Sequence, residues 1–153
     1  MPDRQLISSG SPYESMFGFS RAVRVDDRVF AAGTAPIEPD GSTTPGGMAA
    51  QARRCLTIIE EALVEAGASL SGVVRTRIFV TDITLWEEAV TAHAEAFSDV
   101  RPAATIVQVS ALVAANTHLS AKTLIALLYD SGARIGEMLG LTVDGIDWNG
   151  ALQ

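Results

Sequence analysis

The sequence is poor in the residues that mark several common classes of protein. Its single cysteine, Cys55, cannot form an intrachain disulfide, so nothing points to an oxidising compartment. Lysine and arginine total 11 against 18 acidic residues, and a formal net charge of -7 disfavours generic nucleic-acid binding. The first residues lack the apolar core of a signal peptide, and no apolar run approaches the roughly 18 residues that span a bilayer. We therefore expect a cytoplasmic protein without a membrane segment.

Motifs for cofactors and metals are also missing. The segment 41–47 is rich in glycine but has neither a P-loop lysine nor the spacing of a dinucleotide-binding loop. His93 and His118 are far apart in the sequence and, with one cysteine, do not form a metal-binding pattern. We expect no cofactor and no metal, and we interpret Cys55 and His93 as packed residues on apolar helix stripes.

What the chain does have is the composition of a folded domain. It has 153 residues, of which 48% are hydrophobic and 19% charged, which suits one domain or one domain with an appendage. Alternating and helical hydrophobic patterns predict an α+β fold. The predicted strands cover 6–11, 19–25, 29–32, 73–80 and 105–109, and the predicted helices cover 48–66 and a segment from Asp82 or Thr84 to about Phe97. Asp26-Asp27 is predicted to form a tight turn, and Gly67 to end the first helix.

Five segments, in order from residue 17 to residue 109, resemble the Rid (RidA/YjgF) family. They are FGFSRAV at 17–23, FAAGTAP at 30–36, the helix from AQARR at 50–54 to Ala66-Gly67, VVRTRIFVTD at 73–82 and RPAATIVQV at 101–109. The resemblance implies a chorismate-mutase-like β-sheet packed on two helices. It also implies a homotrimer with small-molecule pockets between subunits. In deaminating members an arginine on the late strand holds the substrate carboxylate while water attacks an imine carbon.

Mapped onto this chain, the resemblance implies seven pocket residues, which are Phe19, Ser20, Gly33, Val90, Arg101, Ala104 and Thr105. Three of them depart from the family pattern. Ala104 stands at the place of the arginine, Phe19 at that of a tyrosine, and Val90 at that of an asparagine. Arg101 either points to the opposite face of the strand or reaches inward from a loop. The favoured interpretation is a small-molecule-binding protein without imine or enamine deaminase activity, and the alternative is an active deaminase.

After Val113 nothing in the sequence resembles the strand that completes the sheet in the Rid family. LIALLYDSGARIGEMLGL at 124–141 and VDGIDW at 143–148 resemble a tyrosine recombinase (phage integrase), in which Arg134 would grip the scissile phosphate and Glu137 would support it. We therefore predict a Rid-like domain at 1–113, a seam at 114–118 and a foreign, mainly helical, truncated segment at 119–153. A second alternative is a recombinase-derived DNA-binding fragment that is catalytically incomplete. The segment 118–128 either replaces the closing strand or stays helical.

Overall fold

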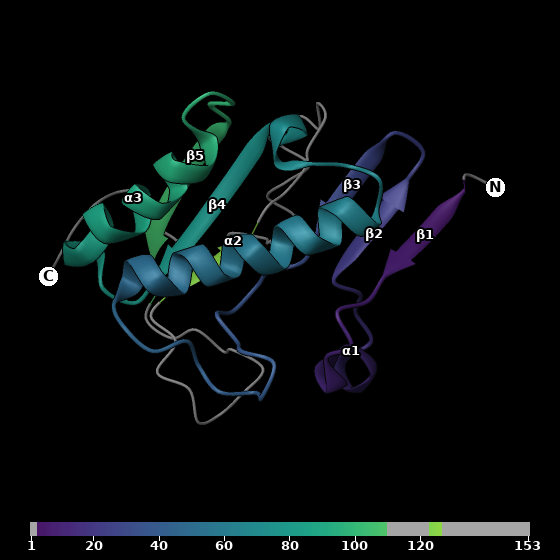
Figure 1. The fold of residues 1–153 in the computed structure, drawn as a ribbon, viewed down its shortest axis with the longest axis horizontal. Coiled ribbons are helices and arrows are strands. Elements are labelled where there is room, and N and C mark those ends of the chain that lie inside the picture. Colours follow the sequence, from purple (N-terminus) through teal and green to yellow (C-terminus); the bar gives the residue numbers. More distant parts are fainter. Residues whose placement is uncertain (1–2, 110–122, 127–153) are drawn as a thin grey trace, which may run out of the picture.

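The computed structural model describes residues 3–109 and 123–126, in which two long helices cover one side of two three-stranded sheets (Figure 1). The α+β prediction is therefore confirmed. In chain order the elements are β1 (Arg4–Ile7), α1 (Pro12–Phe17), β2 (Ala22–Val25), β3 (Arg28–Ala31), α2 (Met48–Glu65), the 3-10 turn η1 (Leu70–Gly72), β4 (Arg75–Val80), the 3-10 turn η2 (Ile83–Leu85), α3 (Trp86–Phe97), β5 (Ala103–Gln108) and β6 (Thr123–Ala126).

The first sheet is an antiparallel meander in the order β1-β2-β3. The predicted hairpin between β2 and β3 is confirmed, and Asp26 takes a left-handed conformation (φ 54) that aspartate tolerates better than most residues. The first strand ends at Ile7, earlier than predicted. Ser11 then caps α1, a short helix that the prediction missed, and Pro12 occupies its first position.

The second sheet has the order β5-β4-β6, so β4 is its central strand. β4 runs parallel to β5 and antiparallel to β6, with Ile78 opposite both Ile106 and Ile125. Of the two alternatives for the segment 118–128, the helix is therefore wrong at Thr123–Ala126, and the strand is confirmed there. An unpaired edge on β4 would leave backbone groups without partners, and such tertiary pairing overrides a weak local preference for helix.

Helix α2 agrees with its predicted span and apolar stripe. Cys55 and Ile59 are fully buried. The helix ends in a Schellman motif, in which the Ala68 N–H donates to the Leu63 carbonyl at 2.8 Å and Gly67 has a φ of 73°. The predicted role of Gly67 is therefore confirmed.

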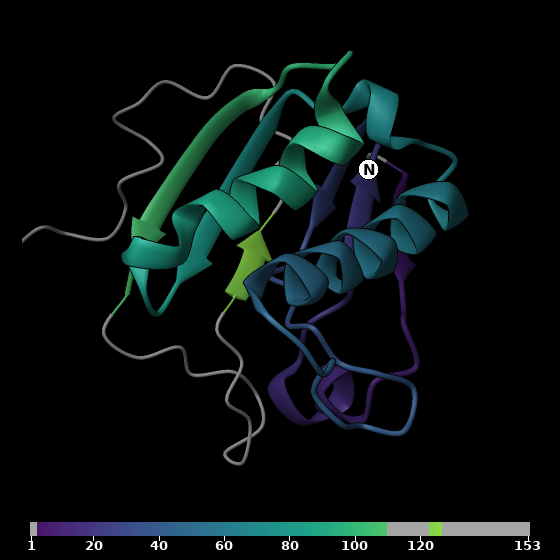
Figure 2. The same cartoon turned by 60° about the vertical axis from the view of Figure 1, so that its left-hand side comes forward.

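Helix α3 lies beside α2 on the same side of the sheets (Figure 2). Its buried face consists of Ala89, Ala92 and Phe97, and small residues let the two helices approach closely. Trp86, the first residue of α3, is 46% exposed. No helix in the described part of the chain is long and apolar enough to cross a membrane.

The hydrophobic core lies between the helices and one face of the sheets. Its largest fully buried side chains include Ile7, Met48, Ile59, Ile78 and Val80. The seam at 114–118, most of the predicted foreign segment, and both Arg134 and Glu137 lie outside the described residues. The resemblance of that segment to a tyrosine recombinase stays a prediction.

Candidate functional site

The seven predicted pocket residues form two groups in the fold. Phe19, Ser20 and Gly33 flank β2 and β3 in the first sheet, whereas Val90, Arg101, Ala104 and Thr105 belong to α3, to β5 and to the loop between them. Among the described residues, no hydrogen bond or ring contact joins the two groups.

On β5, Ala104 pairs with Thr76 of β4, and Thr105 pairs with Arg77. Paired residues of parallel strands point to the same face, and successive residues point to opposite faces. Thr76 is fully buried under the helices, so Ala104 lies on the helix side and Thr105 on the other. The two residues therefore do not line a single surface within one subunit.

Arg101 lies in the loop between α3 and β5, so the alternative of a strand position is wrong. It has a φ of 52°, and its backbone N–H donates to the Phe97 carbonyl at 2.9 Å. Its Nε donates to the Ser98 carbonyl at 3.1 Å. The guanidinium thus binds the C-terminal end of α3, where a cation is favoured.

The histidine nearest to this group is held by a buried threonine. His93 Nε2 and Thr76 Oγ1 lie 2.9 Å apart, and the His93 ring packs against Phe97 with centroids 4.7 Å apart. Burial lowers the pKa of His93 below its ordinary value of 6.5, so the neutral ring predominates at neutral pH. This agrees with the interpretation of His93 as a packed residue, and Val90 lies one turn earlier on the same helix.

The first group surrounds Arg21, a residue that the sequence did not single out. Its side chain is buried, with a relative exposure of 8%. Its Nη1 donates to the Gly33 carbonyl at 3.0 Å and to Thr34 Oγ1 at 2.9 Å, and its guanidinium lies 5.4 Å from the centroid of the Phe19 ring. Its Nε has no hydrogen-bond partner in the described structure.

A buried carboxylate, Glu14, lies near Arg21 but does not form a contact ion pair with it among the described residues. Glu14 accepts hydrogen bonds from Ser8 Oγ at 2.5 Å, from Ser9 N at 2.8 Å and from Ser9 Oγ at 2.6 Å. Burial raises the pKa of Glu14, but these bonds and the charge of Arg21 outweigh it and bring the pKa below the ordinary value. Burial is in turn the main cause that lowers the pKa of Arg21.

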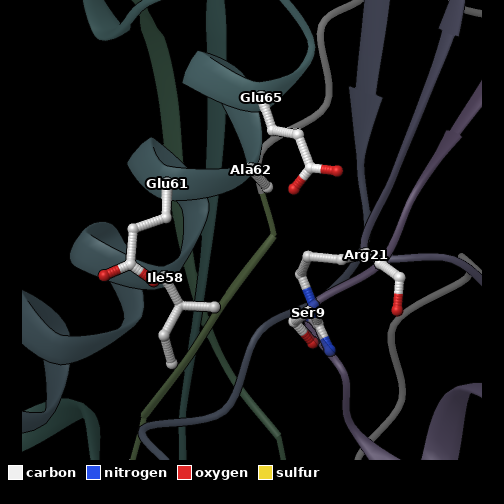
Figure 3. Close-up of a pocket in the computed structure, with 7 residues that line it drawn as sticks. Ser9, Arg21, Ile58, Glu61, Ala62 and Glu65 are labelled. Atoms are coloured by element: carbon white, nitrogen blue, oxygen red, sulfur yellow. The ribbon is translucent and has the colours of Figure 1, made fainter.

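A cavity of about 230 Å³ lies between this cluster and α2 (Figure 3). It is lined by Ser8, Ser9 and Arg21 on one side and by Ile58, Glu61, Ala62 and Glu65 of α2 on the other. Glu61 and Glu65 are exposed, so the cavity borders the surface of α2. Predicting it would have required knowing that α2 packs beside the segment that follows β1.

Cys55 lies behind this cluster and is fully buried, with its Sγ 3.1 Å from the Thr34 carbonyl. The interpretation of Cys55 as a core residue is confirmed. In the part of the chain that the structure describes, no group of three or more His, Cys, Asp or Glu side chains is arranged to hold a metal ion.

Comparison with known proteins finds relatives of similar sequence. An uncharacterised protein of Streptomyces coelicolor is 35% identical over 107 residues, which is 70% of this chain and 80% of that protein. The 2-iminobutanoate/2-iminopropanoate deaminase of Bos taurus is 31% identical over 110 residues, or 71% of this chain and 80% of that enzyme.

Solved structures of members of the same family have a similar fold. The crystal structure of a YjgF/YER057c/UK114-family member from Mycobacterium tuberculosis is 44% identical, with a TM-score of 0.71, and the match covers 84% of this chain and all of that one. A Rid-family protein of unknown function from Yersinia pestis is 26% identical, with a TM-score of 0.72 over 84% of this chain and all of that one.

The family described as Endoribonuclease L-PSP matches residues 11–136 of this chain. The match continues past residue 113, the predicted end of the Rid-like domain, and the boundary itself stays a prediction. Together with the relatives and the solved structures, this match establishes the resemblance first seen in the sequence. The chain belongs to the Endoribonuclease L-PSP family, the family of the Rid (YjgF) proteins.

Proposed function

We propose that this chain is a Rid-family small-molecule-binding protein that lacks imine deaminase chemistry at β5. The observation that carries the proposal is the placement of two residues, Ala104 on β5 and Arg101 in the loop before it. Ala104 presents a methyl group at the place of the carboxylate-binding arginine of deaminating members. Arg101, the arginine nearest in sequence, lies in the loop before β5, and its Nε donates to the Ser98 carbonyl at the end of α3.

The chemistry explains why this substitution matters. A guanidinium holds a carboxylate with two parallel hydrogen bonds, which fixes the substrate while water adds to the imine carbon and ammonia leaves. A methyl group offers neither charge nor donor. Phe19 and Val90 likewise have no polar group at their predicted pocket positions, so a ligand at these residues would be held mainly by apolar contacts.

The experiment is to measure hydrolysis of 2-iminopropanoate by the wild type, by Ala104→Arg and by Ala103→Arg. Ala103 is the matched control, because it neighbours Ala104 on β5 but faces the opposite side of the sheet. We expect the wild type to leave the spontaneous rate unchanged and only Ala104→Arg to accelerate it. A wild-type rate equal to that of the bovine relative would overturn the proposal in favour of an active deaminase. A failure of Ala104→Arg to gain activity would show that Ala104 does not by itself explain the loss.

We also propose that the chain forms a homotrimer with ligand pockets between subunits. The support is the sheet face that the helices leave uncovered, where Leu6, Phe30 and Val107 are 58%, 38% and 39% exposed. Large apolar side chains on such a face favour burial against another subunit. Light scattering on the full chain should give three times the monomer mass, and Phe30→Glu should reduce it. A monomer at micromolar concentration would contradict the proposal.

A further inference from the structure

Arg21 is a buried cation without a neutralising contact. Both hydrogen bonds of its guanidinium use Nη1, and both acceptors, the Gly33 carbonyl and Thr34 Oγ1, are uncharged. Its Nε has no partner in the described structure. The nearby carboxylate of Glu14 is already occupied by Ser8 and Ser9. A buried guanidinium is costly unless acceptors satisfy it, and its N–H groups bind carboxylates strongly.

The opposite wall of the cavity carries the opposite charge. Glu61 and Glu65 lie one turn apart on α2, and neither forms an ion pair with another described residue. Ile58 and Ala62, on the same wall as the two glutamates, provide apolar surface (Figure 3). The cavity thus joins a cationic group, an apolar patch and an acidic rim.

We propose that this cavity binds a small amino acid as a zwitterion, with its carboxylate on the Arg21 side and its ammonium group on the side of Glu61 and Glu65. Ile58 and Ala62 would contact an aliphatic side chain. A volume of about 230 Å³ corresponds to roughly eight water molecules at about 30 Å³ each, which suits a small amino acid. The inference goes beyond the proposed function, because it concerns a site lined by α2 and the segments that flank β1 and β2 rather than β5.

The two charged walls predict a specific selectivity. An anion without an amine would gain the contact with Arg21 but would be repelled by Glu61 and Glu65. An amine without a carboxylate would gain the acidic rim but would leave Arg21 unsatisfied. Only a ligand with both groups complements both walls, so each group alone should bind far more weakly than the zwitterion.

The test is calorimetric titration of the full chain with L-alanine, with propionate and ethylamine as probes that each lack one charged group. We expect saturable binding of L-alanine and at least tenfold weaker binding of the other two. No binding of L-alanine, or equal binding of propionate, would overturn the inference. In the second case the site would be a simple anion site.

Substitutions of the exposed Glu61 and Glu65 test whether L-alanine binds in this cavity, and they leave the hydrophobic core unchanged. The double variant Glu61→Gln/Glu65→Gln should weaken L-alanine binding at least tenfold. The matched control Glu60→Gln, on the same helix but outside the cavity, should not change it. Unchanged binding in the double variant would overturn the inference.

A variant at β5 separates this inference from the proposed function. Ala104→Arg should leave L-alanine binding unchanged, because Ala104 does not line the cavity. If instead only Ala104→Arg altered L-alanine binding, the amino acid would bind beside Ala104 on β5. The inference would then fail while the proposed small-molecule-binding function remained.

Discussion

Thr76 and His93 join the central strand of the second sheet to α3 through one hydrogen bond of 2.9 Å between Oγ1 and Nε2. Thr76 is fully buried, and His93 is partly covered by Phe97. Burial lowers the pKa of His93 in the folded protein below 6.5, so the unfolded chain binds more protons near that pH. The free energy of unfolding should therefore be highest above pH 6.5 and fall as the pH drops through 6.5 towards the folded pKa.

Urea unfolding at a series of pH values between about 8 and 5.5 checks this prediction. His93→Gln removes the titrating group and should flatten the dependence over this range. Identical pH profiles for the variant and the wild type would show that His93 is not responsible.

Glu88 of α3 contacts the N-terminus of α2, beside its N-cap residue Gly47. A Cβ at Gly47 would lie 2.6 Å from Glu88 Oε2, which itself lies 3.4 Å from the Ala49 N–H at the N-terminus of α2. Gly47→Ala should displace the carboxylate from the helix terminus and cost about 1 kcal/mol. In a double-mutant cycle with Glu88→Ala this cost should largely disappear. Additive costs would show that the glycine matters for another reason.

Glu14 anchors the segment between β1 and α1 through its three hydrogen bonds from Ser8 and Ser9. Glu14→Gln replaces an acceptor oxygen by a donor amide, and we expect a loss of about 1–3 kcal/mol of unfolding free energy. The exposed Ser15→Ala on the same helix is the control. Because the folded pKa of Glu14 is lowered, its contribution should be present above about pH 4.5 and lost as the pH falls below that value. A pH-independent difference between the variant and the wild type would contradict this prediction.

The pairing of β6 with β4 is a backbone interaction, which prolines test directly. Consecutive N–H groups of a strand point in alternate directions, so Leu124→Pro/Ile125→Pro must remove at least one that faces β4. Leu124→Ala/Ile125→Ala shortens the same side chains but keeps every N–H. We expect the free energy of unfolding of the proline variant to be lower than that of the alanine variant by at least about 1 kcal/mol. The proline variant should therefore unfold at a lower urea concentration. Equal midpoints would show that this strand does not stabilise the sheet.

The elements predicted well are those with strong local signals. The apolar stripe that includes Cys55 and Ile59, followed by Gly67, determines α2 and its end almost alone. The Asp26-Asp27 turn likewise indicated the hairpin. For α1 a local signal existed, because Ser11 followed by Pro12 is a typical helix start, but six residues are too few to show a helical period.

The errors concern residues whose roles depend on distant partners. Thr123–Ala126 has a helical pattern, and pairing with β4 makes it a strand. Arg21 is buried beside its acceptors on Gly33 and Thr34, which follow β3 and so lie two strands later in the chain. Arg101 is bound by the end of α3, and its backbone conformation cannot be read from side-chain patterns. Hydrophobic periodicity predicts which face of a helix or strand a residue occupies, but it does not predict which atoms contact that residue.

The position of β6 also bears on how the chain acquires its structure. The first sheet joins consecutive strands, so it can form as soon as residues 4–31 are available. Val80 of β4 instead pairs with Thr123, which lies 43 positions later in the chain. Contacts of such long range slow folding, because the intervening loop is closed before any pairing energy is gained. During synthesis on the ribosome, β4 should therefore lack its β6 partner until residues 123–126 have emerged.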